Sequence, residues 1–193
     1  MRLPPASRGW PSSCLSALRW AVQRKASCCY LRVSAAAATA APARGSGIIT
    51  IGKLGPEDRP AWEELFHGYN TFYQEEHPQS MYDRAWDEFQ RDERMHALGA
   101  WLDGSLVGIV HFFIHVRTTG SDVCYLEDLF TAPAARGHGV GRALIGAVRD
   151  WAAERGCGRV YWHTHETNAT ARTLYDKVAT LPGFIMYAIE LEG

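Results

Sequence analysis

The first 56 residues of this 193-residue chain contain no aspartate or glutamate, although they include eight lysine or arginine residues. The rest of the chain carries 12 basic and 21 acidic residues. The formal net charge of −1 therefore hides two segments of opposite sign, a basic one followed by an acidic one. Because the later and longer segment is acidic, the sequence argues against nucleic-acid binding and suits a cationic partner.

Long apolar runs and paired cysteines are also missing. No stretch approaches the roughly 18 consecutive apolar residues of a membrane-spanning helix, so we expect no membrane association. Three of the five cysteines, Cys14, Cys28 and Cys29, lie in the early basic segment. Neither Cys124 nor Cys157 belongs to a Cys-x-x-Cys motif, which argues against a disulfide framework, a structural zinc site and thioredoxin-like chemistry.

Residues 1–45 are rich in arginine, serine and alanine, and Leu15, Leu18 and Val22 are spaced to share one helical face. This acid-free composition is typical of an organelle transit peptide, and its arginine content favours the mitochondrion over the plastid. The alternative is a translation start assigned too far upstream, with a protein that stays in the cytoplasm. We expect residues 1–45 to be a targeting or disordered leader and residues 48–193 to form one domain.

From residue 48 onward, strand-like and helix-like patterns alternate. Apolar runs predict strands at residues 48–51, 96–102, 106–116, 159–165 and 184–191, and another from residue 125. Apolar residues spaced three and four apart predict helices after Pro56, after Pro78, and over residues 142–154 and 167–177. The pair Asp103-Gly104 predicts a tight hairpin between the second and third strands. The expected order is β-α-α-β-β-β-α-β-α-β.

The stretch Tyr125–Ile145 reads as an apolar strand, a glycine-rich turn and an apolar-periodic helix. Gly137, Gly139 and Gly141 allow the backbone to approach a ligand closely, and the amides that open the next helix lack intrahelical partners. With Arg136 beside them, they predict a phosphate-binding turn. The turn has neither the Lys-Ser/Thr of a P-loop nor the G-x-G-x-x-G spacing of a dinucleotide fingerprint.

The segment Arg136-Gly137-His138-Gly139-Val140-Gly141 resembles the acetyl-CoA loop of the Gcn5-related N-acetyltransferase (GNAT) superfamily, Arg/Gln-x-x-Gly-x-Gly/Ala. Residues 168–175 resemble the family's Asn-x-x-Ala-x-x-Leu-Tyr helix, and Gly183-Phe184 follows after a longer connection than most members have. Residues 160–168 are similar to the subgroup of fungal histone, polyamine and D-amino-acid acetyltransferases and their bacterial relatives.

The resemblance implies an α/β GNAT fold, a mixed and mostly antiparallel sheet with helices on both faces. It also implies acetyl-CoA as the co-substrate, and a homodimer fits the family. The residues that it assigns to the cofactor are the strand end Leu129, Phe130 and Thr131, the loop Arg136, Gly137, His138, Gly139, Val140 and Gly141, and Asn168. We expect no metal, because His163 and His165 share a strand face but no third ligand has suitable spacing.

Acetyl transfer to an amine needs a base, because an alkyl ammonium with an unperturbed pKa near 10.4 has no lone pair until it loses a proton. The family often has its base on the strand of Glu127, which we favour, with Asp128 or a water relay as alternatives. Strand alternation would place the two carboxylates on opposite faces. Tyr175 matches the family position of the acid that protonates the departing thiolate.

These patterns predict an N-acetyltransferase that acts on a primary amine of a small molecule such as an amino acid or a polyamine. A protein or histone lysine acetyltransferase and a non-catalytic acyl-CoA-binding module are the alternatives. The aromatic residues of the first two helices either pack as core or, with Tyr69, Tyr73, Glu75 and Glu76, form a wall of the substrate pocket.

Overall fold

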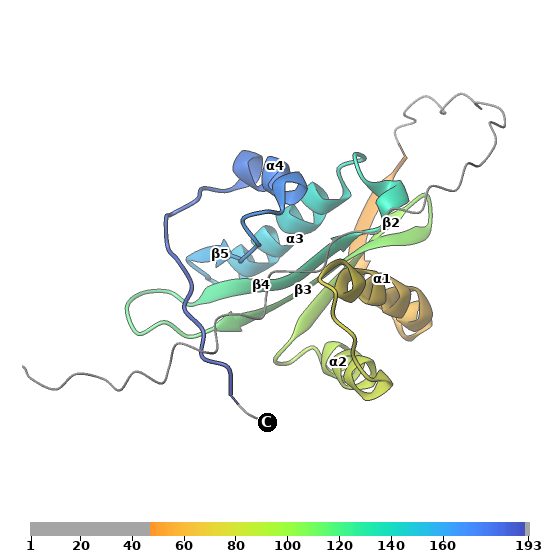
Figure 1. Cartoon of the computed structure of the whole chain (residues 1–193), viewed down its shortest axis with the longest axis horizontal. Helices are drawn as coiled ribbons and strands as arrows, with labels where there is room; N and C mark the ends of the chain where they lie inside the picture. The colour runs from red at the N-terminus through yellow and green to blue at the C-terminus, as the bar shows by residue number, and fades with distance from the viewer. Residues whose placement is uncertain (1–46, 192–193) are drawn as a thin grey trace, which may run out of the picture. The chain divides into compact units, whose positions relative to one another are not determined.

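The structure is a computed structural model that describes residues 47–191, and it contains a five-stranded sheet with helices on both faces (Figure 1). The strands are β1 (Ile49–Lys53), β2 (His96–Leu102), β3 (Ser105–His115), β4 (Val123–Thr131) and β5 (Arg159–Tyr161). The helices are α1 (Arg59–Phe72), α2 (Gln79–Arg91), α3 (Val140–Glu154) and α4 (Ala169–Val178), with 3₁₀ turns at Pro56–Asp58 and Pro133–Ala135. The predicted leader at residues 1–45 lies outside the described residues.

The strands lie side by side in their sequence order. Neighbours from β1 to β4 are antiparallel, and β5 is parallel to β4. The β2–β3 connection is the predicted hairpin, in which Asp103 and Gly104 have φ values of 51° and 85°, as a two-residue turn requires. The structure thus confirms the mixed, mostly antiparallel sheet. In the described part, no helix is both long and apolar enough to cross a membrane.

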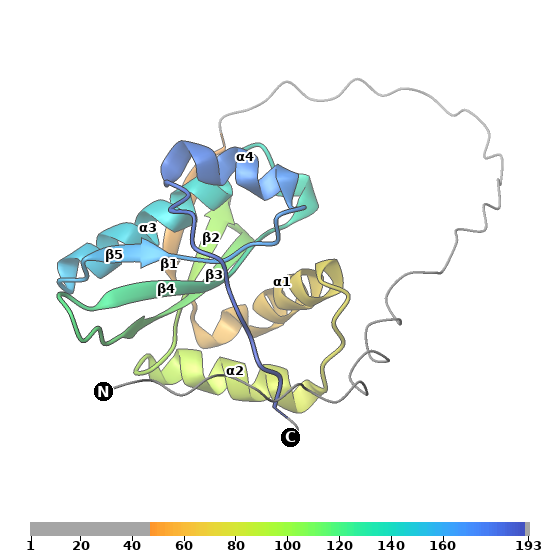
Figure 2. The same ribbon diagram turned by 60° about the vertical axis from the view of Figure 1, so that its left-hand side comes forward.

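Two apolar cores attach the helices to the sheet. On one face, Leu144 and Val148 of α3 belong to a core with Phe112 of β3. On the other face, Trp62 of α1 and Trp86 of α2 belong to a second core. Both views show α3 and α4 on one side of the sheet and α1 and α2 on the other (Figures 1 and 2).

The close contact between β3 and α3 depends on Gly108. A Cβ atom at this position would lie 2.7 Å from Cγ1 of Val140 and 3.2 Å from the carbonyl oxygen of Phe130. A larger residue would therefore push the start of α3 away from the sheet. With glycine there, the first turn of α3 lies directly over the end of β4.

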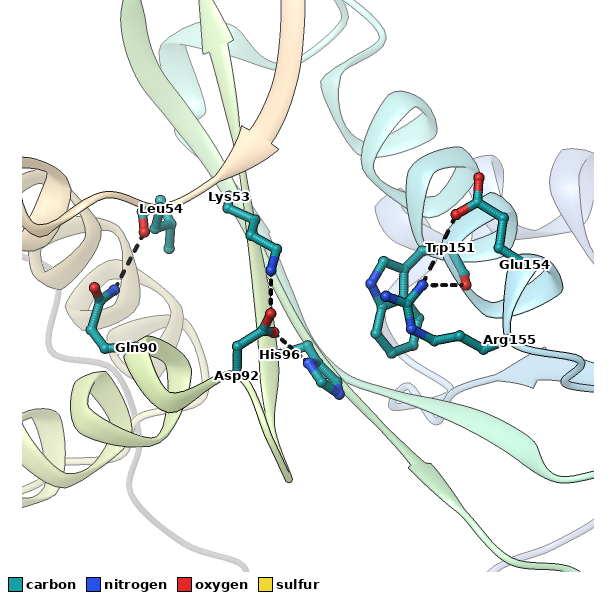
Figure 3. Close-up of polar contacts among 8 residues, drawn as sticks. All are labelled: Lys53, Leu54, Gln90, Asp92, His96, Trp151, Glu154 and Arg155. Atoms are coloured by element: carbon teal, nitrogen blue, oxygen red, sulfur yellow. Dashed lines mark hydrogen bonds and ion pairs between the residues drawn. The ribbon is translucent and has the colours of Figure 1, made fainter.

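The C-terminal end of α2 is fastened to the sheet by Asp92, which caps the helix in the left-handed conformation with a φ of 53° (Figure 3). Its carboxylate pairs with Lys53 of β1 and lies 2.5 Å from Nδ1 of His96 of β2. Burial alone would raise the pKa of Asp92, but the hydrogen bonds from His96 and Lys53 outweigh it and lower the pKa. At the C-cap of α3, the guanidinium of Arg155 covers the ring of Trp151, a residue of that helix, at 3.7 Å from its centroid (Figure 3).

The predicted strand at residues 184–191 is wrong. Residues 179–191 contain no helix or strand, and they lead from α4 toward the side of the sheet on which α1 and α2 lie instead of following β5 (Figures 1 and 2). Six large apolar side chains in this segment are 70–88% exposed: Phe184, Ile185, Met186, Tyr187, Ile189 and Leu191. The strand expected to pair with this segment, β5, has three residues, Arg159–Tyr161, instead of the expected 159–165. It therefore offers little backbone edge with which residues 184–191 could pair.

Candidate active site

A cleft opens where β4 and β5 separate. Their pairing joins Val123–Tyr125 to Arg159–Tyr161, and beyond Tyr125 the outer edge of β4 has no strand partner within residues 47–191. On its other side β4 stays paired with β3 as far as Thr131. The separation therefore begins before the strand end Leu129–Thr131 that was assigned to the cofactor, and it leaves a longer stretch of backbone free to bind a ligand.

The cleft has a volume of about 980 Å³ and lies between the free edge of β4, the start of α3 and α4. Nine of the ten residues predicted to hold the cofactor line it: Leu129, Phe130, Thr131, Arg136, Gly137, Gly139, Val140, Gly141 and Asn168. The tenth, His138, is not among the lining residues. Its Nδ1 lies 3.3 and 3.2 Å from the carbonyl oxygens of Ala135 and Arg136. Because a carbonyl oxygen only accepts, Nδ1 donates to these oxygens, and the imidazole stabilises the loop.

The start of α3 forms an anion cradle. Gly137 and Gly139 have φ values of 83° and 90°, and a Cβ on either glycine would meet nothing within 4 Å. The first amide in the helix with a backbone acceptor is that of Ala143, which donates to the carbonyl of Gly139. The amides of the first turn are therefore free to bind an anion, which the positive end of the helix dipole also favours.

Basic side chains surround the cradle. Arg136 is held by a 3.3 Å hydrogen bond from its Nε to the carbonyl of Thr131, and its guanidinium lies 5.9 Å from the ring centroid of Phe130. Arg142 and Lys177 also line the cleft. The sequence analysis missed Lys177, although it lies three residues after the lining residue Leu174 on the same helix. Together these side chains make the phosphate end of the cleft positive.

Asn168 is the N-cap of α4. Its Oδ1 accepts a hydrogen bond from the amide of Ala171 at 3.3 Å, and its Nδ2 donates to Oγ1 of Thr164 at 3.3 Å. Because both ends of the amide are used within the protein, we expect Asn168 to serve the cleft by fixing the first turn of α4. That helix carries Tyr175 two turns further on.

Tyr175 lines the cleft, with its ring in T-shaped contact with Trp162 at 5.2 Å between centroids. Burial raises the pKa of Tyr175 to about 12, with a smaller contribution from Tyr73. The hydroxyl therefore keeps its proton near neutral pH and is available to donate it to a ligand.

The C-terminal end of α1 forms another part of the wall. Tyr69, Phe72 and Tyr73 line the cleft, as predicted for the two tyrosines. Glu75 and Glu76 are not among the lining residues. Instead, Oε2 of Glu75 pairs with Nε2 of His77 at 3.1 Å.

Glu127 lies in a β-bulge of β4 that simple strand alternation did not predict. His111 pairs with Asp128 and Phe112 pairs with Leu126, so Glu127 has no partner on β3. Glu127 does not line the cleft, and its side chain reaches solvent. The surrounding protein still desolvates the carboxyl enough to raise its pKa, and the charge of Asp128 raises it further. A raised pKa makes this carboxylate a stronger proton acceptor.

The two histidines considered as metal ligands do not converge. His163 Nδ1 contacts the Tyr125 hydroxyl at 3.1 Å, and His165 Nδ1 contacts Oγ1 of Thr167 at 2.7 Å. Within residues 47–191, no group of three histidine, cysteine or acidic side chains is arranged to hold a metal ion.

A sheet that splits between two strands, with a glycine cradle for phosphates and a protonated tyrosine in the same cleft, suits an acyltransferase that draws on coenzyme A. Residues 62–179 match the acetyltransferase (GNAT) family, and the chain belongs to this family. Its members use acetyl-CoA as the acetyl donor.

Relatives with assigned activities support this classification. Over 144 residues the chain is 31% identical to the D-amino-acid N-acetyltransferase HPA3 of Saccharomyces cerevisiae, covering 72% of this chain and 89% of that protein. Over 112 residues it is 30% identical to an aminoglycoside N(6')-acetyltransferase type 1 of Salmonella typhimurium, covering 56% and 74%. The solved structure of AAC(6')-Iy with a bisubstrate analogue shares the fold, with a TM-score of 0.66, 21% identity, and coverage of 75% and 99%.

The substitution Gly139→Val tests the cradle. A β-branched residue at a φ of 90° is strained by about 1–3 kcal/mol, and its side chain would occupy the open space over the free amides. We expect calorimetry to detect no CoA binding by this variant. Gly120→Val is a matched control, because Gly120 has a φ of 111°, equally open surroundings and no place in the cleft. The control should lose similar stability and still bind CoA; unchanged CoA affinity in Gly139→Val would show that phosphates bind elsewhere.

Proposed function

We propose that this protein transfers an acetyl group from acetyl-CoA to a primary amine of a small molecule. The observation that carries the proposal is that one cleft holds the phosphate cradle of α3, the unpaired edge of β4 and the protonated hydroxyl of Tyr175. In this assignment the pyrophosphate lies at the amides of the first turn of α3, beside Arg136 and Arg142. The pantetheine arm lies along β4, where Leu129–Thr131 offer backbone donors and acceptors.

Two side chains divide the proton transfers. Glu127 takes a proton from the acceptor ammonium, directly or through a water, and leaves a lone pair on nitrogen. The nitrogen then bonds to the acetyl carbon as the carbon–sulfur bond breaks. Tyr175 gives its proton to the departing thiolate sulfur and is reprotonated by the second proton, which the nitrogen loses as the amide forms. Glu127 returns the first proton to solvent. No acyl-enzyme is required, because the amine attacks the thioester itself.

A small cationic amine is the acceptor that the chain favours. The segment after residue 56 has 21 acidic and 12 basic residues, so it attracts cations. The relative from yeast is named for D-amino acids and that from Salmonella for aminoglycosides, both small amines. A protein lysine acetyltransferase and a non-catalytic acyl-CoA-binding module remain the competing functions.

An amine panel separates these functions. Release of free thiol from acetyl-CoA should be followed with D- and L-amino acids, polyamines, aminoglycosides and a lysine-containing peptide. Turnover with the small amines supports the proposal, and turnover with the peptide alone supports a protein acetyltransferase. Thermal stabilisation by CoA without turnover on any amine would indicate a binding module.

Removal of one hydroxyl by Tyr175→Phe tests the general acid. The ring and its contact with Trp162 are kept, so CoA affinity should change little while the single-turnover rate falls about 10²- to 10⁴-fold. The activity of the wild-type protein should not fall with rising pH until the pH approaches about 12, the pKa to which burial raises Tyr175, because its hydroxyl keeps its proton below that pH. Tyr82→Phe is the control, because it removes a buried hydroxyl that accepts from Asn70 outside the cleft. A rate for Tyr175→Phe within about twofold of wild type would assign Tyr175 to packing.

We also propose that residues 1–45 direct the protein to mitochondria, on the strength of their acid-free, arginine-rich composition. Residues 1–47 fused to a fluorescent protein should colocalise with a mitochondrial dye. A fusion with Arg19 and Arg24 replaced by glutamate should stay in the cytosol, since the positive charge of the segment is then reduced. Diffuse fluorescence from the unaltered fusion would reject the targeting role and leave the enzymatic proposal intact.

We propose further that two copies associate through the exposed segment 184–191. Burial of each aromatic ring in it would remove about 150–250 Å² from water, so two such segments with their aliphatic residues approach the roughly 1,200–2,000 Å² of a stable interface. In sedimentation velocity the full chain should be a dimer, as should a chain ending at Leu191. A chain ending at Pro182 should be a monomer. A full chain that is monomeric at every concentration tested would contradict the association.

A further inference from the structure

A histidine in the middle of β3 has no part in the function proposed above. His111 is fully buried, with 0% of its surface exposed. Its ring stacks on Phe89 at 4.2 Å between centroids and meets the edge of Phe66 at 4.9 Å. A polar ring among aromatic side chains is costly unless both nitrogens are hydrogen-bonded.

Both nitrogens of His111 have partners. Nε1 of Trp62 lies 2.9 Å from Nε2 of His111, and Nδ1 of His111 lies 2.8 Å from Oδ2 of Asp128. An indole N–H can only donate, so Nε2 accepts, and the ring proton is on Nδ1, which donates to Asp128. The hydrogen bonds thus run in one direction, from Trp62 through His111 to the carboxylate. This direction fits an ionised Asp128, because a carboxylate only accepts.

The anchored carboxylate of Asp128 directly follows the bulged residue Glu127, and its charge acts on the Glu127 carboxyl. Without the bulge, residues 126 and 128 would face the same side of the sheet. With it, Leu126 packs in the core beneath α3, whereas Asp128 turns to His111 on the side of α1 and α2. The side chain of Asp128 is only 15% exposed, so its position is set by the protein and not by solvent.

Several titratable groups surround this point: Tyr125 and Asp128 on β4, His111 on β3, Tyr69 and Tyr73 on α1, and Tyr161 on β5. Burial raises the pKa of Tyr125 to about 12 and also raises that of Tyr69, so neither adds a negative charge near neutral pH. His111 is held neutral by its two hydrogen bonds. Asp128 is therefore the fixed negative charge beside Glu127.

We propose that Asp128 is a positioning residue for the acetyl transfer, a negatively charged neighbour, anchored through His111 to Trp62, that keeps Glu127 an effective proton acceptor. This inference rests on the proposed function, in which Glu127 is the base. The negative field of Asp128 makes Glu127 hold a proton more firmly, and this is the property that a base needs to take a proton from an ammonium.

The substitution Asp128→Asn isolates the charge. The shape is kept, and the remaining carbonyl oxygen can still accept from Nδ1 of His111. The acidic limb of kcat/KM, which reports Glu127, should move to lower pH, because burial still raises the pKa of Glu127 but the like charge that raises it further is gone. Asp122→Asn removes a carboxylate just before the same strand and should leave the limb in place.

A direct titration keeps this test independent of turnover. Carbon-13 NMR of labelled glutamate side chains, assigned with Glu127→Gln, follows the Glu127 carboxyl in the full chain without any substrate. The same downward shift should appear in Asp128→Asn even if no amine is acetylated, a result that would reject the proposed function and keep the charge coupling. An unmoved Glu127 titration would overturn the inference, and so would complete loss of the acidic limb, which would make Asp128 the base itself.

The anchor is tested by Trp62→Phe, which removes the indole N–H and keeps an aromatic ring. Nε2 of His111 then loses its donor, so the ring is no longer held in the orientation that fixes Asp128 beside Glu127. The Glu127 titration should move in the same direction as in Asp128→Asn, but by less. A titration identical to wild type would show that Trp62 has only a packing role and would remove it from the proposal.

Discussion

The candidate site depends on the separation of two parallel strands. β4 is paired on both sides only as far as Tyr125, and from there its outer edge carries unpaired backbone groups beside the first turn of α3. An unpaired strand edge and an uncapped helix start are both short of hydrogen-bond partners, and here they face the same cleft. A ligand with a phosphate at one end and amide groups along its length satisfies both. Gly108 keeps them close together, because it lets α3 lie directly on β3.

The same strand carries a second irregularity with a different effect. The bulge at Glu127 reverses the alternation of side chains along β4, so that one acidic residue turns to the buried His111 and the other stays at the surface of the strand. Two adjacent acids thereby gain different surroundings. Asp128 is fixed by a hydrogen bond from the buried His111, and Glu127 is exposed and can exchange protons with solvent. This division of roles comes from the register of β4 on β3 and not from the two residue types.

Local signals in the sequence predicted local structure well. The glycines at 137 and 139 adopt the positive φ values that motivated the phosphate turn, and the helix periodicity placed the start of each helix in residues 47–191 to within a few residues. What failed depends on distant partners. The bulge at Glu127 is a property of the register between β3 and β4, and strand alternation could not reveal it.

The ends of the fold were also hard to predict. The apolar pattern at residues 184–191 has the composition of a strand, but a strand exists only where a neighbour offers an edge, and β5 has three residues. The partnership of Trp62, His111 and Asp128 joins three separate elements. No spacing along the chain indicates it.

The cradle has a consequence for how the protein would respond to its surroundings. The free amides of α3, the basic side chains near them and the edge of β4 are all assigned to the nucleotide and the pantetheine arm, which acetyl-CoA and free CoA have in common. Transfer of the acetyl group removes none of these contacts, so the product competes for the cleft on nearly equal terms. Where both molecules are present well above their dissociation constants, the rate would follow the ratio of acetyl-CoA to CoA more than the amount of either. Such an enzyme would respond to the ratio of acetyl-CoA to CoA in whichever compartment contains it.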